Sequence, residues 1–166
     1  MAETLTLTAT DKAGRYEEIL PQIASVTADE TDRTANLANT AAILKEAFDF
    51  FWVGFYEVKS TDGGEAQLVL GPFQGPLACT RIRRGRGVCG TAWVERRTLV
   101  VPDVNLFPGH IACSSLSRSE IVVPIFAPDS DEVVAVIDID SREPATFDDT
   151  DRRHLERLAV LLSAHW

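Results

Sequence analysis

The spacing of apolar residues changes twice along this 166-residue chain, and these changes constrain the fold more than any other feature of the sequence. Up to about Phe48, apolar residues recur at steps of three and four, as they do on one face of a helix. From Trp52 onward, short aromatic and β-branched runs alternate with turn-forming segments, which is typical of strands joined by hairpins. After Asp148 the helical spacing returns. This order predicts an α+β fold in which the terminal helices pack on one face of an antiparallel sheet.

The boundaries of the elements follow from the same spacing. Four helices are predicted, and the first covers residues 13–25, where Pro21 kinks or interrupts it. The second runs from an N-cap at 27–29 to about residue 48, and the third covers residues 87–97. The fourth is a C-terminal segment capped by Asp148 or Thr150. Predicted strands cover residues 52–58, 67–73, 98–101, 120–126 and 133–140. Residues 133–137 are almost continuously apolar, which favours a central strand covered on both faces. Residues 104–119 lack periodicity and are predicted to form a long loop, and we expect one domain over residues 1–166.

Charge and hydropathy limit the partners of the chain. The formal net charge is −9, which disfavours nucleic acid because phosphate binding needs clustered positive charge. No run of 18 apolar residues is present, and the N-terminus lacks the features of a signal peptide. We therefore expect no membrane partner and a cytoplasmic location. One basic segment, residues 81–86, is either a solvated loop or a feature that attracts an anionic substrate or lowers the pKa of Cys79 and Cys89.

The three cysteines of the chain, Cys79, Cys89 and Cys113, fall within 35 residues. An odd number of cysteines in a cytoplasmic protein argues against a structural disulfide framework. Because Cys89 and Cys113 lie beside glycine-rich turning segments rather than in apolar runs, we expect reactive thiols. Spacings of 10 and 24 residues do not match a zinc motif, so we expect no metal site. A nucleophilic pair of Cys113 with His110 is an alternative, but their spacing on a loop does not fix the required geometry.

The segment Gly85-Arg86-Gly87-Val88-Cys89-Gly90 matches the glycine pattern of dinucleotide-binding sites. Such a site needs an apolar strand directly before the glycines and a full crossover helix after them. Here residues 81–84 are mostly basic, and the following helix is short. We therefore interpret the glycines as a sharp turn that brings Cys89 close to another part of the chain.

Three carboxylates form the second group of candidate site residues. Glu120 begins a predicted strand, and Asp138 and Asp140 end the most apolar one. A spacing of two places both aspartates on the same face of that strand. The pair either marks a solvated strand end or belongs to a functional site in which one carboxyl has a raised pKa and donates a proton.

Eight blocks of sequence, in order, resemble the free methionine-(R)-sulfoxide reductases, which are stand-alone GAF domains. The blocks are residues 52–56, 70–75, 78–82, 85–92, 101–104, 107–113, 119–125 and 138–141. The resemblance implies a central six-stranded antiparallel sheet with helices packed on it, and reduction of free methionine-(R)-sulfoxide rather than of the residue inside proteins. It also implies a homodimer.

The resemblance also implies roles for the three cysteines. Cys113 matches the cysteine that attacks the sulfoxide, Cys79 the main resolving cysteine, and Cys89 a further recycling or auxiliary cysteine. Attack by the Cys113 thiolate leaves a sulfenic acid, which a nearby thiol converts to a disulfide. An external reductant such as thioredoxin then opens that disulfide, and no bound cofactor is implied. The order in which Cys79 and Cys89 act stays open.

The acids and an aromatic residue complete the implied site. Glu120, Asp138 and Asp140 match the acidic residues of the substrate pocket, and Trp52 matches the aromatic wall near the substrate methyl group. A sulfoxide sulfur is electrophilic only once its oxygen is protonated or strongly hydrogen-bonded, so an acid must face the thiolate. Which of the three carboxyls donates the proton stays open. A redox-sensing or ligand-binding GAF domain without turnover is the alternative function.

The chain departs from the family pattern near these blocks, at Phe51, Arg83, Arg84 and in the segment 114–118, which includes Ser114 and Leu116. None of these positions is a predicted cysteine or acid of the site. The departures therefore bear on the affinity for substrate rather than on the chemistry.

Overall fold

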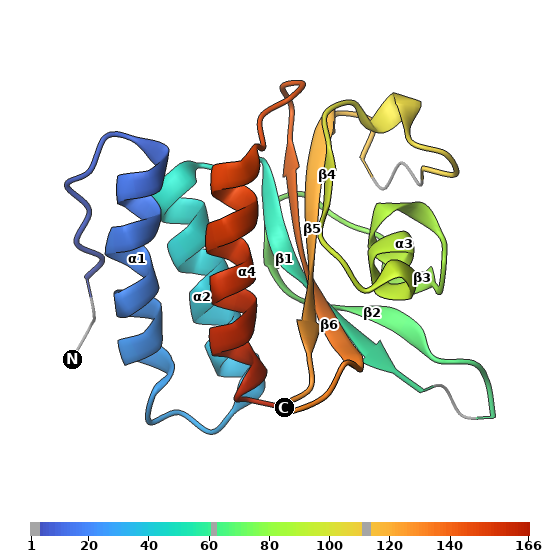
Figure 1. The fold of residues 1–166 in the computed structure, drawn as a ribbon, viewed down its shortest axis with the longest axis horizontal. Coiled ribbons are helices and arrows are strands. Elements are labelled where there is room, and N and C mark those ends of the chain that lie inside the picture. Colours follow the sequence, from blue (N-terminus) through green and yellow to red (C-terminus); the bar gives the residue numbers. More distant parts are fainter. Residues whose placement is uncertain (1–3, 61–62, 111–113) are drawn as a thin grey trace.

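A six-stranded antiparallel sheet separates helices α1, α2 and α4 from helix α3 (Figure 1). The computed structural model describes residues 4–60, 63–110 and 114–166. The elements are α1 (Lys12–Thr27), α2 (Arg33–Phe48), β1 (Trp52–Lys59), β2 (Gln67–Gln74), β3 (Arg81–Arg83), α3 (Gly87–Glu95), β4 (Leu99–Val101), the 3₁₀ helix η1 (Val104–Leu106), β5 (Ser119–Phe126), β6 (Val133–Ser141) and α4 (Asp149–Ser163). The strand order is β3-β2-β1-β6-β5-β4. The predicted α+β class and the six-stranded sheet are confirmed. Within the described ranges, no helix is both long and apolar enough to span a membrane.

Helices α2 and α4 pack on the sheet, and α1 packs on both of them. Asp148 caps α4 by accepting hydrogen bonds from the backbone amides of Thr150 and Asp151, so the first of the two predicted caps is correct. The N-cap of α2 is Asp32, and the prediction at residues 27–29 is wrong because α1 continues to Thr27. Pro21 does not interrupt α1, whose neighbouring apolar side chains are buried in the core.

The edge strand β3 was missed in the sequence because two of its three residues are arginines. Arg81 and Arg83 are exposed, whereas Ile82 between them is 5% exposed. The strand pairs antiparallel with β2, with Ile82 opposite Leu68. Charged side chains are a common feature of edge strands, where they oppose pairing with other chains. The basic segment is therefore part strand and part turn rather than a loop throughout.

Apolar side chains fill both sides of the sheet. One cluster lies between the sheet and helices α1, α2 and α4, and includes Ile137 of β6. The second lies between the sheet and α3, and includes Val136 of β6 together with Trp52 and Tyr56 of β1. The prediction that residues 133–137 form a central strand covered on both faces is confirmed.

Gly54 of β1 allows the aromatic side chains of the second cluster to approach the sheet closely. A Cβ atom at this position would lie 2.4 Å from Cβ of Phe73 and 2.7 Å from Cη2 of Trp52. We expect Gly54→Ala to destabilise the fold by about 1–3 kcal/mol, the typical cost of overpacking. Urea unfolding measures the loss, and near-ultraviolet circular dichroism reports displacement of the indole.

Gly63→Ala is the matched control for this prediction. An added Cβ at Gly63 meets no atom of the described residues within 4 Å, although its φ of +71° makes alanine unfavourable by roughly 1–2 kcal/mol. The control is therefore expected to change stability without changing the near-ultraviolet spectrum. An unchanged spectrum for Gly54→Ala as well would contradict the proposed contact.

Candidate active site

A small pocket of about 40 Å³ opens on the α3 side of the sheet. Its floor comes from strands β1, β5 and β6, and one wall comes from the first turn of α3. The residues that line it are Phe51, Trp52, Tyr56, Leu77, Ala78, Ile82, Arg86, Gly87, Val88, Cys89, His110, Ser114, Ser117, Glu120, Asp138 and Asp140. Five of the seven predicted site residues are therefore brought together in one pocket, although they are as many as 88 positions apart in the chain (52 to 140).

The sheet register places the three predicted acids beside one another. Asp140 of β6 pairs with Glu120 of β5 on one side and with Trp52 of β1 on the other. Asp138 lies two residues earlier on β6, on the same face, and pairs with Gly54 of β1. The register of three adjacent strands thus builds an acidic group with an aromatic neighbour.

Burial changes the protonation of these acids. Glu120 and Asp138 are 6% and 7% exposed, and burial and the neighbouring carboxyls raise the pKa of each well above its usual value. Burial raises the pKa of Asp140 to about 6, against a hydrogen bond with Ser117 that lowers it. The interpretation of the aspartates as a solvated strand end is wrong for Asp138, which is buried. The arrangement holds protons in an enclosed site, as general-acid catalysis requires.

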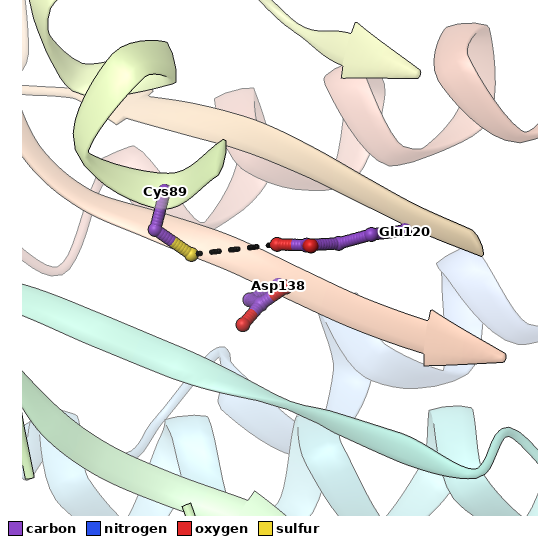
Figure 2. A group of neighbouring side chains, drawn as sticks. All are labelled: Cys89, Glu120 and Asp138. Atoms are coloured by element: carbon purple, nitrogen blue, oxygen red, sulfur yellow. Dashed lines mark hydrogen bonds between the residues drawn. The ribbon is translucent and has the colours of Figure 1, made fainter. Parts of the chain in front are cut away.

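Cys89 lies in the first turn of α3 and faces Glu120 and Asp138 (Figure 2). Its side chain is 2% exposed, and its Sγ lies 4.0 Å from Oε1 of Glu120. Burial and the charges of Asp138 and Glu120 raise the pKa of the thiol well above its usual value. The alternative that the basic segment lowers this pKa is wrong for Cys89, because burial and the neighbouring carboxyls raise it. Cys89 lies within the helix predicted over residues 87–97, which the structure confirms as α3.

The burial of Cys89 predicts low reactivity toward alkylating reagents. Because the thiolate is the reactive form, a buried thiol with a raised pKa should react with iodoacetamide at least about tenfold more slowly in the native protein than in urea. Peptide mapping by mass spectrometry, with the protein fully reduced beforehand, measures the label at Cys89. Equal rates in the native and unfolded protein would contradict this prediction.

The other two cysteines are placed differently. Cys79 lies between β2 and β3, is half-buried, and packs against the second apolar cluster. Its carbonyl oxygen accepts a hydrogen bond of 2.8 Å from the hydroxyl of Tyr56. Cys113, with its predicted role as the attacking thiol, lies outside the described residues. The residues described on either side of that gap, His110 and Ser114, both line the pocket.

Aromatic rings form one wall of the pocket, as the sequence predicted for Trp52. The indole is stacked on Phe73 with 5.3 Å between ring centroids and on Tyr56 with 6.0 Å. Sequence reasoning missed Tyr56, although the period of two from Trp52 places it on the same face of β1. It also missed Ser117, for which the aperiodic sequence of its loop offers no signal.

The match to known proteins covers most of the chain. A family model described as "GAF domain" matches residues 22–166. The chain belongs to the GAF domain family. In the solved structures, it is similar to free methionine-R-sulfoxide reductase from Neisseria meningitidis in complex with its substrate, with a TM-score of 0.91 and 59% identity over 98% of this chain and 94% of that one.

Similarity to GAF proteins extends to eukaryotes. GAF domain-containing protein A of Dictyostelium discoideum is 53% identical over 98% of this chain and 99% of its own length. Free methionine-R-sulfoxide reductase of Saccharomyces cerevisiae is 42% identical over 89% of this chain and 85% of its own length. The resemblance inferred from the eight sequence blocks is therefore confirmed.

Proposed function

We propose that this GAF domain protein is an oxidoreductase that reduces free methionine-(R)-sulfoxide to methionine. The observation that carries the proposal is the group of buried carboxyls in a small pocket, in which raised pKa values keep protons available on Glu120 and Asp138 beside Asp140. The similarity to proteins named for this activity supports the same function. Protonated carboxyls are the acids that a sulfoxide oxygen needs before a thiolate can attack its sulfur.

The attacking thiolate is proposed to be Cys113, which directly precedes the pocket residue Ser114 in the sequence. Its sulfur attacks the sulfoxide sulfur while a carboxyl transfers a proton to the sulfoxide oxygen. The sulfoxide gains two electrons and leaves as methionine, and Cys113 loses two electrons and becomes a sulfenic acid. The S–O bond then breaks, the hydroxyl group bonds to Sγ of Cys113, and the transient bond between the two sulfurs breaks. Methionine keeps both electrons of that bond, so the step needs no other reductant.

The geometry favours Cys79 over Cys89 as the thiol that resolves the sulfenic acid. Condensation of the sulfenic acid with a thiol releases water and forms a disulfide. Cys89 is buried with a raised pKa, which disfavours its thiolate, whereas Cys79 is half-buried. A dithiol such as thioredoxin is the proposed external reductant that reopens the disulfide. The homodimer and the cytoplasmic location stay predictions.

The pocket suits a free amino acid. The acidic lining is suited to the ammonium group that a free amino acid presents and that a methionine residue within a protein chain lacks. Of the three acids, Asp140 has the smallest shift and is the first to ionise as the pH rises toward neutrality. We assign the ionised Asp140 to the ammonium group, and Glu120 and Asp138 to the sulfoxide oxygen. The rings of Trp52 and Tyr56 form the apolar surface for the methyl group.

The proposed function is tested by following NADPH oxidation with purified protein, thioredoxin and thioredoxin reductase. We expect turnover of free methionine-(R)-sulfoxide and none of its (S) epimer or of the (R)-sulfoxide inside a peptide. Absence of turnover with either epimer, once the thiols are shown to be reduced, would favour a ligand-binding or redox-sensing GAF domain instead.

A further inference from the structure

Three side chains with metal-ligating atoms lie next to one another in the pocket lining (Figure 2). They are Cys89 of α3, Glu120 of β5 and Asp138 of β6, and all three are buried. The sulfur and one oxygen from each carboxyl lie within 4.8 Å of one another. Their separation by 31 and 18 residues in the chain explains why no metal motif is visible in the sequence.

The carboxyls of this cluster have no ion-pair partner in the described part of the chain. Asp138 is 7% exposed, and its Oδ1 atom is buried without a hydrogen-bond partner among the described residues. No lysine or arginine in the described part of the chain forms an ion pair with Glu120 or Asp138. A buried carboxylate oxygen without a partner is unfavourable, so the site must retain protons or accept a cation.

We propose that Cys89, Glu120 and Asp138 bind a divalent cation of the zinc class. A thiolate ligand selects zinc and similar borderline metals over Mg²⁺ and Ca²⁺, which prefer oxygen ligands. Tetrahedral zinc with ordinary bond lengths places a sulfur and an oxygen ligand about 3.6 Å apart. The observed separation of 4.0 Å between Sγ of Cys89 and Oε1 of Glu120 is close to this value, so a small side-chain shift completes the site.

Three protein ligands leave the fourth position of a tetrahedral ion open to the pocket, because all three residues line it. The bound ion would occupy Glu120 and Asp138, the two carboxyls assigned to the sulfoxide oxygen. Metal binding and substrate binding therefore exclude each other, and the cation acts as a reversible inhibitor. The proposed metal site does not depend on the proposed activity, whereas the inhibition does rest on that activity.

Titration of the reduced apoprotein with Co²⁺, a spectroscopic probe for zinc, tests the site directly. We expect a near-ultraviolet thiolate-to-Co²⁺ charge-transfer band that Zn²⁺ removes in equimolar amount. Cys89→Ser should abolish the band, and Asp138→Asn should weaken Co²⁺ affinity at least tenfold. Addition of free methionine-(R)-sulfoxide should lower the apparent Co²⁺ affinity of the Cys113→Ser variant, which keeps the proposed ligands and does not consume the sulfoxide.

The other cysteines supply matched controls. Cys79→Ser and Cys113→Ser each remove a thiol outside the proposed ligand set, so both should retain the band. Loss of the band in either variant, or its persistence in Cys89→Ser, would assign the metal to other thiols and overturn the proposal. The absence of a band in the wild-type protein would also overturn it. Far-ultraviolet circular dichroism verifies that each variant is folded, and Asp138→Asn tests the site if Cys89→Ser does not fold. Binding that methionine sulfoxide leaves unchanged would overturn the inhibition.

Discussion

Replacing Cys113 by serine is expected to abolish methionine formation, with a loss of at least about 10³-fold in rate. A serine hydroxyl at neutral pH is a far weaker nucleophile than a thiolate, and the protonated Glu120 and Asp138 do not act as a base to activate it. The measurement is chromatographic detection of methionine after mixing reduced protein with free methionine-(R)-sulfoxide.

Cys79→Ser is the informative companion to this variant. Because its Cys113 is intact, we expect it to release one methionine per subunit without any external reductant, and then to recycle slowly when thioredoxin is present. Cys89→Ser should also release one methionine in the first turnover, with a smaller loss in the multiple-turnover rate than Cys79→Ser. Robust multiple turnover by Cys113→Ser would overturn the assignment of the attacking thiol.

The order of helices and strands could be predicted because, in most elements, the apolar residues follow a single regular spacing. The central strand β6 is one example, since Val136 and Ile137 face opposite apolar layers. The edge strand β3 could not be predicted because it has three residues and only Ile82 is buried. Short edge strands bury too little apolar surface to show a period.

The membership of the site was easier to predict than its geometry. The spacing of Asp138 and Asp140 placed both carboxyls on one face, but their pairing with Glu120 depends on the register between β5 and β6. The burial of Cys89 depends on which way the first turn of α3 points, which the glycine pattern around it does not reveal. Proximity between residues on three separate elements is a property of packing rather than of local sequence.

Replacing either protonated carboxyl by its amide is expected to lower kcat/KM for free methionine-(R)-sulfoxide by about 10²–10³-fold near pH 7. Glu120→Gln and Asp138→Asn preserve size and hydrogen bonding but cannot transfer a proton. Glu132→Gln, in the exposed turn between β5 and β6, removes one carboxyl far from the pocket and serves as the matched control, with activity close to wild type.

The pH dependence of activity follows from the direction of the pKa shifts. Burial raises the pKa of Glu120 and of Asp138, so the acid form that donates a proton is present below each raised pKa and is lost as the pH rises through it. The thiolate of the attacking cysteine becomes more abundant in the same direction. We therefore expect a bell-shaped profile of kcat/KM whose descending limb belongs to the carboxyls, and Glu120→Gln should alter that limb alone.

Stability provides an independent check of the same shifts. A carboxyl whose pKa is raised by folding binds more protons in the native state than in the unfolded state. The free energy of unfolding therefore falls as the pH rises from the pKa of the unfolded state toward the pKa of the folded state. An amide at position 120 has no proton to lose, so Glu120→Gln should flatten this decline relative to the wild type. Urea unfolding between pH 5 and about pH 8 measures it. If Glu120→Gln retained wild-type kcat/KM while flattening the decline, Glu120 would be buried and protonated without acting as the proton donor.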